Sequence, residues 1–118
     1  MKKLTILLLA AILLTACGQA KGNEQEAMYV NITAQGAKTI MDTEQGYVIL
    51  DTRTWEEYDQ GHIPGAIQIS HDEITEKAEE MLTDKDQLIL VNCRRGRRSK
   101  IAAEALVELG DKNIKEFG

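Results

Sequence analysis

Cys93 lies in a sequence context that favours a nucleophilic thiolate. It follows the apolar run 88–91 and stands directly before a helical pattern, in a turn where four arginines surround one glycine. The arginines are Arg94, Arg95, Arg97 and Arg98. Unpaired amides and the positive end of a helix dipole stabilise an anion at such a turn, and neighbouring guanidinium groups add to the effect. Because such settings lower a cysteine pKa from about 8.5 to roughly 3.5–7.5, we expect Cys93 to react as a thiolate rather than pack as an ordinary buried cysteine.

The distribution of charge favours a small anionic ligand. The chain has 118 residues and a formal net charge of −5, so the basic turn belongs to an otherwise acidic protein. A concentrated positive patch suits the capture of a small anion, whereas nucleic acid would need a broader basic face. We therefore expect a small anionic substrate and no nucleic-acid partner.

Apolar runs that suit β-strands alternate with helical patterns from residue 29 onward. The strand candidates are 29–32, 47–50, 66–69, 88–92 and 113–117. A first helix is predicted over 33–42, where Thr33 can cap the entry. A second helical face after His71 consists of Ile74, Ala78, Met81 and Leu82. Such alternation predicts an α/β fold with a mainly parallel sheet.

The clearest helical pattern begins at the basic turn. Its apolar face consists of Ile101, Ala102, Ala105, Leu106 and Leu109, and Gly110 stands where a C-terminal cap belongs. The preceding run 88–91 is apolar at every position, as expected for a strand covered on both faces by helices. Ligands of such sheets bind beyond the carboxyl ends of the strands. Cys93 is predicted to lie at one of those ends.

The first 18 residues suggest a targeting signal. Lys2 and Lys3 precede the apolar stretch 4–14, which is too short to span a bilayer comfortably and favours a signal peptide. Small residues before Cys17 resemble the lipobox of bacterial lipoproteins. The resemblance implies cleavage before Cys17 and lipidation of its sulfur; cleavage by the ordinary signal peptidase, leaving a secreted protein, is the alternative.

A domain organisation follows from this interpretation. Residues 1–16 are the expected lipoprotein signal peptide, 17–26 the lipidated Cys17 with a polar, flexible tether, and 27–118 the folded domain. The protein is then expected outside the cytoplasm, anchored to a bacterial membrane by its lipid. Cys93 would be the remaining free thiol of the mature chain, with no intramolecular disulfide available to it.

Three sequence blocks resemble the single-domain rhodaneses. They occupy 49–58, 61–67 and 93–99, and read Ile-Leu-Asp-Thr-Arg-Thr-Trp-Glu-Glu-Tyr, Gly-His-Ile-Pro-Gly-Ala-Ile and Cys-Arg-Arg-Gly-Arg-Arg-Ser. The blocks occur in the family's order and at compatible spacing. The resemblance implies a rhodanese-like α/β fold, with a central, mainly parallel five-stranded sheet flanked by helices. It also implies sulfurtransferase activity through a cysteine persulfide in a cradle-shaped loop.

The resemblance also implies roles for the third block. Cys93 would take sulfur from a thiosulfate-like anionic donor and pass it to a thiol, cyanide or protein-thiol acceptor. The expected substrate-binding residues are Arg94, Arg95, Gly96, Arg97, Arg98 and Ser99. Among these, Arg98 is expected to support the loop, the other arginines to influence substrate choice, and Gly96 to relieve the turn. No cofactor or metal site is predicted, and the protein is expected to be a monomer.

Two further functions remain as alternatives. Cysteine-dependent phosphatases use Cys, five residues and then Arg, whereas here Ser99 takes that position and Arg98 precedes it. The shorter loop should close more readily around one sulfur atom than around a tetrahedral phosphate, which disfavours phosphatase or arsenate reductase activity. Rhodanese-like domains also serve as sulfur carriers or non-catalytic binding modules. The intact Cys93 and its basic loop favour chemistry over an inert module.

The first two blocks are interpreted as mainly structural. Asp51 and Arg53 could act as an acid and an anion clamp, but a hydrogen-bonded pair that braces loops near the site is the favoured interpretation. His62 lies in a Gly-His-Ile-Pro-Gly turn, which favours a structural role over that of a general base. Rhodaneses of this type usually continue past the final Phe-Gly with another glycine and a short tail. The domain 27–118 is expected to lack this tail, which would uncover apolar surface.

Overall fold

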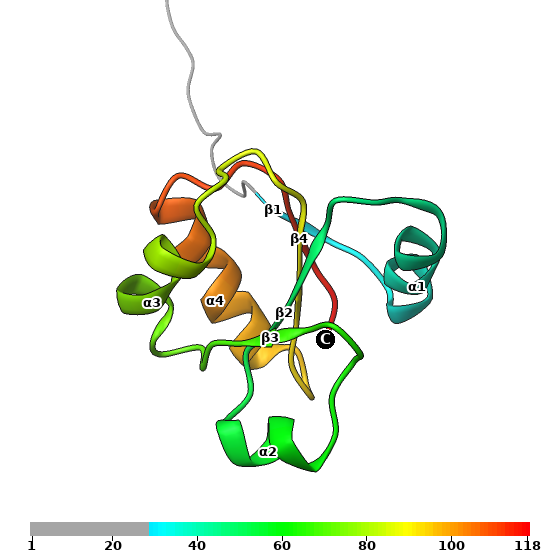
Figure 1. Cartoon of the computed structure of the whole chain (residues 1–118), viewed down its shortest axis with the longest axis horizontal. Helices are drawn as coiled ribbons and strands as arrows, with labels where there is room; N and C mark the ends of the chain where they lie inside the picture. Colours follow the sequence, from blue (N-terminus) through cyan, green and yellow to red (C-terminus); the bar gives the residue numbers. More distant parts are fainter. Residues whose placement is uncertain (1–28) are drawn as a thin grey trace, which may run out of the picture.

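Five short strands form a parallel sheet in the computed structural model, which describes residues 29–118 (Figure 1). The strands are β1 (Tyr29–Asn31), β2 (Val48–Asp51), β3 (Ile67–Gln68), β4 (Ile89–Asn92) and β5 (Ile114–Glu116). Their order across the sheet is β1-β5-β4-β2-β3, and each neighbouring pair is parallel. The predicted fold class is therefore confirmed, and β4, which precedes Cys93, lies in the middle of the sheet.

Helices cover both faces of this sheet. They are α1 (Ala34–Thr43), α2 (Trp55–Gln60), α3 (Ile74–Met81) and α4 (Arg97–Glu108). Figure 1 shows α1 on one face and α3 with α4 on the other, while α2 lies beyond the end of the sheet where β2 finishes. Parallel strands require crossover connections, and helices in those crossovers bury both faces of the sheet.

The side chains of β4 separate two apolar clusters. Ile89 and Val91 belong to the cluster beneath α3 and α4, whereas Leu90 belongs to the cluster with Ala37 of α1 and Phe117. Successive strand side chains point to opposite faces, so an uninterrupted apolar strand supplies both clusters at once. All three β4 side chains are fully buried, which holds the carboxyl end of β4 in place.

The helix entries follow from local capping. Thr33 caps α1, as predicted, because its Oγ1 accepts a hydrogen bond from the Gly36 N–H at 2.9 Å. Helix α2 was not predicted, although its entry is a capping box in which Thr54 and Glu57 exchange hydrogen bonds. This short helix matters because Glu57 reaches the candidate site.

The predicted signal peptide, the lipidated Cys17 and the tether lie outside the described residues. Within 29–118, none of the helices combines the length and apolar character needed to cross a membrane.

Candidate active site

Cys93 lies in the turn that joins the centre of the sheet to α4. Strand β4 ends at Asn92, and α4 begins at Arg97, so only a short loop connects them. Gly96 caps the helix with φ 83° and ψ −15°, a left-handed conformation that costs other L-residues about 1–2 kcal/mol. The positive φ turns the chain back so that the loop wraps around the cysteine sulfur.

The sulfur of Cys93 accepts hydrogen bonds from two backbone amides. The nitrogen of Gly96 lies 3.0 Å from Sγ, and that of Ser99 lies 3.2 Å from it. The Ser99 hydroxyl oxygen is 3.4 Å from the same sulfur. Cys93 is only 6% exposed, so these donors replace much of the water that would otherwise solvate a thiolate. Converging N–H groups of this kind form an anion-binding nest.

The hydrogen bonds decide the ionisation of the thiol. Burial raises the pKa of Cys93, but hydrogen bonds from the side chain and backbone of Ser99 and from the backbone of Arg95 and Gly96 outweigh it. The pKa of Cys93 therefore lies below its ordinary value, and the thiolate is favoured. The sequence argument gave the neighbouring guanidinium groups a share in this effect, whereas the loop's hydrogen bonds are its leading cause.

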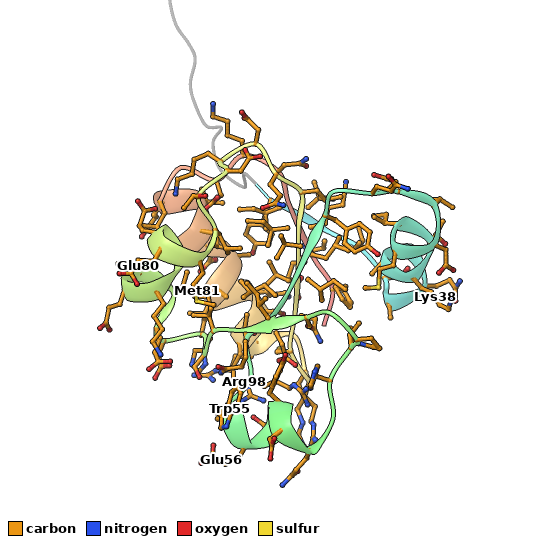
Figure 2. The ribbon with its side chains drawn as sticks, viewed as in Figure 1. Lys38, Trp55, Glu56, Glu80, Met81 and Arg98 are labelled. Atoms are coloured by element: carbon orange, nitrogen blue, oxygen red, sulfur yellow. The ribbon has the colours of Figure 1, made fainter. Side chains whose placement is uncertain are left out.

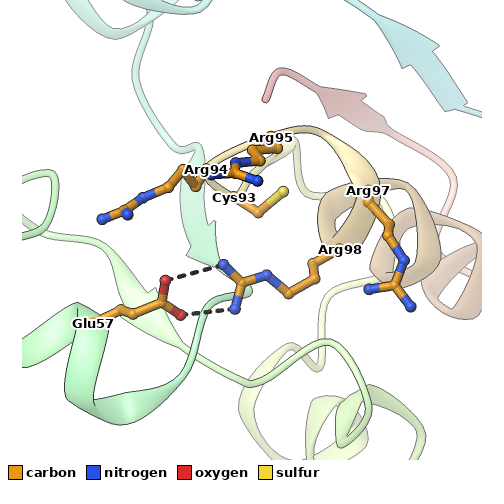
Figure 3. Close-up of a pocket in the computed structure, with 6 residues that line it drawn as sticks. All are labelled: Glu57, Cys93, Arg94, Arg95, Arg97 and Arg98. Carbon is orange, nitrogen blue, oxygen red and sulfur yellow. Dashed lines mark hydrogen bonds and ion pairs between the residues drawn. The ribbon is translucent and has the colours of Figure 1, made fainter.

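A pocket of about 350 Å³ opens at Cys93. It is lined by Glu57, Cys93, Arg94, Arg95, Arg97 and Arg98. Figure 3 shows Arg94 and Arg97 extending to opposite sides of Cys93, while Arg98 runs toward Glu57. The structure thus brings the predicted cysteine and all four predicted arginines to one small, mostly cationic pocket.

The guanidinium of Arg98 is held by Glu57. Its Nη1 lies 2.7 Å from Oε1 and its Nη2 lies 3.1 Å from Oε2, a bidentate pair. The hydrogen bond from Arg98, followed by that from the Thr54 backbone, lowers the pKa of Glu57 to about 2. Figure 2 shows Arg98 beside α2, from which Trp55 and Glu56 project. Arg98 therefore ties the Cys93 loop to α2.

Three other arginines remain available to a ligand. Arg94, Arg95 and Arg97 have exposed side chains, and no carboxylate within 29–118 forms an ion pair with them. Cations at the start of a helix are unfavourable unless an anion joins them. The arrangement therefore divides the predicted arginines into one that braces the loop and three that can meet an anion.

The buried Asp51 and the partly buried Arg53 form an ion pair beside the site. Arg53 Nη2 lies 2.6 Å from Asp51 Oδ2, and the Arg53 Nε and backbone N–H also donate to the Asp51 carboxylate. Arg53 Nη2 donates as well to the carbonyl of Gly61 at 2.7 Å. The pair joins the end of β2 to the turn after α2. Neither residue lines the Cys93 pocket.

Sequence reasoning did not identify Glu57 or Glu116 as site residues. Glu57 could have been found from the Thr54-x-x-Glu57 spacing, which is typical of a capping box at a helix entry. Glu116 carries no local signal. It is 3% exposed, and its Oε2 lies 2.5 Å from the hydroxyl oxygen of Ser99. The Ser99 hydroxyl therefore lies between this carboxyl group and the Cys93 sulfur, which is 3.4 Å from the hydroxyl oxygen.

The two histidines lie outside this pocket. His62 stacks on Tyr58 with ring centroids 3.6 Å apart, and its Nδ1 lies 2.8 Å from the Tyr58 carbonyl oxygen. His71 lines a separate hollow of about 550 Å³ that also includes Trp55 and Lys77. The structure therefore places no histidine of residues 29–118 where it could exchange a proton with Cys93.

The fold and the site together define a class of α/β protein. In this class a cysteine follows a central parallel strand, and the amides of a tight loop surround its sulfur at the start of a helix. Residues 33–117 match the family Rhodanese, described as Rhodanese-like domain. The chain belongs to the rhodanese-like domain family.

Curated relatives of this chain include sulfur-handling proteins. It is 32% identical over 97 residues to the "Putative sulfur carrier protein YrkF" of Bacillus subtilis, covering 82% of this chain and 51% of that protein. It is 36% identical over 69 residues to the "Thiosulfate sulfurtransferase PspE" of Escherichia coli, covering 58% of this chain and 66% of that protein. The chain thus spans between about half and two thirds of the length of these two relatives.

Solved structures agree with the fold. A rhodanese-related protein from Thermoplasma volcanium matches with a TM-score of 0.65 and 31% identity, over 76% of this chain and 85% of that one. A rhodanese with anions from E. coli matches with a TM-score of 0.57 and 34% identity, over 59% of this chain and 82% of that one.

Proposed function

We propose that this protein is a sulfurtransferase that moves sulfane sulfur from a thiosulfate-like donor to a thiol acceptor through a persulfide on Cys93. The observation that carries the proposal is the pair of amides, Gly96 and Ser99, directed at Sγ from 3.0 and 3.2 Å. Such a nest favours a sulfur anion without a side-chain base. Relatives named as a thiosulfate sulfurtransferase and as a putative sulfur carrier support the same chemistry.

In the first half-reaction the Cys93 thiolate attacks the outer sulfur of thiosulfate. A new S–S bond forms at Cys93, the donor's S–S bond breaks, and sulfite leaves with the bonding electron pair. The charges balance, because a thiolate and a thiosulfate dianion give a persulfide anion and a sulfite dianion. Arg94, Arg95 and Arg97 offer unpaired guanidinium groups that suit both oxyanions.

In the second half-reaction an acceptor thiolate attacks the outer sulfur of the persulfide. The acceptor then carries the sulfur, and Cys93 is released as a thiolate that can begin another cycle. The lowering of the Cys93 pKa assists this step, because a more stable thiolate is a better leaving group. Cyanide or a protein thiol could replace the small thiol as acceptor.

Sulfite release from thiosulfate tests this proposal directly. The wild-type full chain should release sulfite and gain about 32 Da on Cys93, the mass of one sulfur atom. Cys93→Ser should do neither, whereas Cys17→Ser, which removes the other cysteine of the sequence, should do both. Absence of sulfite and of the mass gain in the wild type would refute the proposal.

The same assay distinguishes the alternatives. Mass gain on Cys93 without turnover in the presence of an acceptor would favour a sulfur carrier, the role that the name of the Bacillus subtilis relative suggests. Hydrolysis of an aryl phosphate that is lost in Cys93→Ser would instead favour a cysteine-dependent phosphatase. The length of the Cys93 loop argues against phosphatase activity, because Arg98 stands one position earlier than the arginine of cysteine-dependent phosphatases and Ser99 takes that place.

We further propose that the protein is a lipoprotein held outside the cytoplasm by lipid on Cys17, with a tether over 17–26 and the domain over 27–118. The support is the sequence of the first 18 residues, with its basic start, apolar stretch and small residues before Cys17. Cells fed a lipid label should incorporate it into the wild type and not into Cys17→Ser. Equal labelling of both, or unlabelled wild-type protein, would refute the anchor.

A further inference from the structure

Glu57 is the acidic residue in the wall of the Cys93 pocket. The other residues that line this pocket are the cysteine itself and four arginines. Figure 3 shows the Glu57 carboxylate directed at the Arg98 guanidinium, to which its two oxygens are hydrogen-bonded. The Arg98 and Glu57 side chains are 22% and 25% exposed, so solvent screens the pair only in part. A carboxylate at this place changes the charge that an anionic ligand meets.

The Glu57 carboxylate is ionised and fixed in position at neutral pH. The hydrogen bond from Arg98, followed by that from the Thr54 backbone, lowers the pKa of Glu57 to about 2. Besides Arg98, Glu57 Oε1 contacts the backbone nitrogen and the hydroxyl of Thr54, each at 3.1 Å. The entry of α2 therefore holds the carboxylate in place, and Arg98 has a negatively charged partner at every pH at which a sulfur anion would be handled.

The charge of Arg98 is close enough to Cys93 to influence an anion there. The pKa of Arg98 is raised above its ordinary value, first by the hydrogen bond to Glu57 and, more weakly, by the charges of Glu57 and Cys93. An unpaired guanidinium at this position would add its full positive charge to the anion site. Beside Glu57 its effect on a ligand is largely cancelled, because opposite charges in contact act at a distance as a dipole.

The charges of the pocket match those of a dianion. Four guanidinium groups stand against the Glu57 carboxylate and the Cys93 thiolate, which leaves two positive charges. Thiosulfate before the transfer and sulfite after it are both dianions, so either one neutralises the pocket. Without the Glu57 carboxylate three positive charges would remain, and a bound dianion would be held by an excess of positive charge.

We propose that Glu57 is a specificity-determining residue that limits the affinity of the Cys93 pocket for oxyanions by neutralising Arg98. The three other arginines of the pocket attract the donor, and Glu57 prevents the same pocket from retaining the sulfite that leaves. The inference rests on the proposed sulfur transfer for its use, because sulfite must depart before an acceptor can reach the outer sulfur of the persulfide. It concerns the anion site itself, so the test needs no sulfur donor.

Two substitutions separate the charge of Glu57 from its role in bracing Arg98. Glu57→Gln removes the charge and keeps the brace, because glutamine also serves in a capping box and its amide oxygen can still accept a hydrogen bond from Arg98. Glu57→Asp keeps the charge, but its shorter side chain loses the bidentate geometry seen here. An effect of charge therefore appears in the glutamine variant, and an effect of bracing appears in the aspartate variant.

Protection of Cys93 against alkylation by iodoacetamide measures the anion affinity. Sulfate serves as an unreactive dianion and methanesulfonate as a monoanion of similar shape. Mass spectrometry of the Cys93 peptide gives the rate relative to that without the anion and keeps Cys17 out of the measurement. At about 0.1 M salt, Glu57→Gln should bind sulfate about fivefold more tightly than the wild type and methanesulfonate about twofold more tightly. The Coulomb energy scales with the charge of the ligand, so the first factor should be about the square of the second.

Glu56→Gln is the matched control for the loss of one carboxylate. Glu56 precedes Glu57 on α2, is exposed and does not line the Cys93 pocket. Because salt screens exposed charges beyond about 10 Å, this variant should change the affinity for sulfate by less than about twofold. Glu57→Asp should also stay within about twofold of the wild type, since its charge remains. During turnover, Glu57→Gln should be inhibited by sulfite at about fivefold lower concentration.

Three outcomes would overturn the inference. Glu57→Gln could bind sulfate no more tightly than the wild type, or Glu57→Asp could change the affinity as much as Glu57→Gln does; in either case Glu57 braces the loop and does not limit the anion affinity. Sulfate could also fail to protect Cys93 in the wild type, and then the pocket is no anion site. Failure of the proposed sulfur transfer shows itself separately as missing sulfite release, and the protection assay gives its answer in either case.

Discussion

Replacing Gly96 by alanine should destabilise the domain through backbone conformation alone. The φ of Gly96 is 83°, and a Cβ built there meets nothing closer than the Gly118 carbonyl oxygen at 3.6 Å. There is room for the methyl group, so the cost is the left-handed conformation, about 1–2 kcal/mol. A less flexible unfolded chain returns about 0.4–1 kcal/mol. The expected net loss is about 1 kcal/mol, or roughly 4–8 °C in Tm for a domain of this size.

Thermal unfolding followed by circular dichroism measures this loss against two controls. Gly96→Asn should lose less than Gly96→Ala, because asparagine enters the left-handed region more readily. Gly36→Ala lies in the first turn of α1, where the new Cβ would come 3.3 Å from the capping Thr33 Oγ1; this tight contact offsets the gain in helix propensity, so its Tm should stay close to that of the wild type. If Gly96→Ala were as stable as the wild type, the positive φ would not be imposed by the fold, and the account of the loop would be wrong.

Three further predictions address the charged groups. The pKa of Glu57 is depressed to about 2. The stability that its pair with Arg98 contributes is therefore present above the usual pKa of about 4.3 and is lost as the pH falls toward 2. Acid unfolding of Glu57→Gln should lack this loss of stability, and identical acid unfolding of the wild type and the variant would count against the pair. Asp51→Asn leaves the Arg53 charge without its partner and should cost about 3 kcal/mol in urea unfolding, whereas a loss under about 1 kcal/mol would mean that the pair is dispensable. Arg95→Glu should raise the KM for thiosulfate by about tenfold at low salt, less at high salt, with Tm unchanged; an unaltered KM would remove Arg95 from the anion site.

The fold could be predicted from short-range patterns because its central strand is buried on both faces. The apolar run that became β4 and the helical face of α4 indicated a parallel α/β sheet without any long-range information. Helix α2 was not predicted because its six residues are too few to show a helical periodicity. The sequence signal for this helix is its capping box, the Thr54-x-x-Glu57 spacing that is typical of a helix entry.

The candidate site was predictable only where its parts are adjacent in sequence. Cys93 and the loop arginines follow one another, so their juxtaposition needed no fold. The partners of the loop come from distant positions: Arg98 meets Glu57 across 41 residues, and Ser99 meets Glu116 across 17. A helix-capping glutamate such as Glu57 and an acidic residue at the end of a strand such as Glu116 do not indicate which distant residue they will contact, so both contacts required the tertiary structure.

The pairing of β1 with β5 has a consequence for the order in which the domain is built. Tyr29 aligns with Ile114, and β5 also pairs with β4, so the sheet cannot be completed until residues near both ends of the domain are together. Contacts between sequence-distant segments close slowly, because loop-closure entropy is lost before they form. Glu116 arrives with β5, so we expect the Ser99 hydroxyl, which lies 3.4 Å from the Cys93 sulfur, to gain its hydrogen bond to the Glu116 carboxyl group only late in folding.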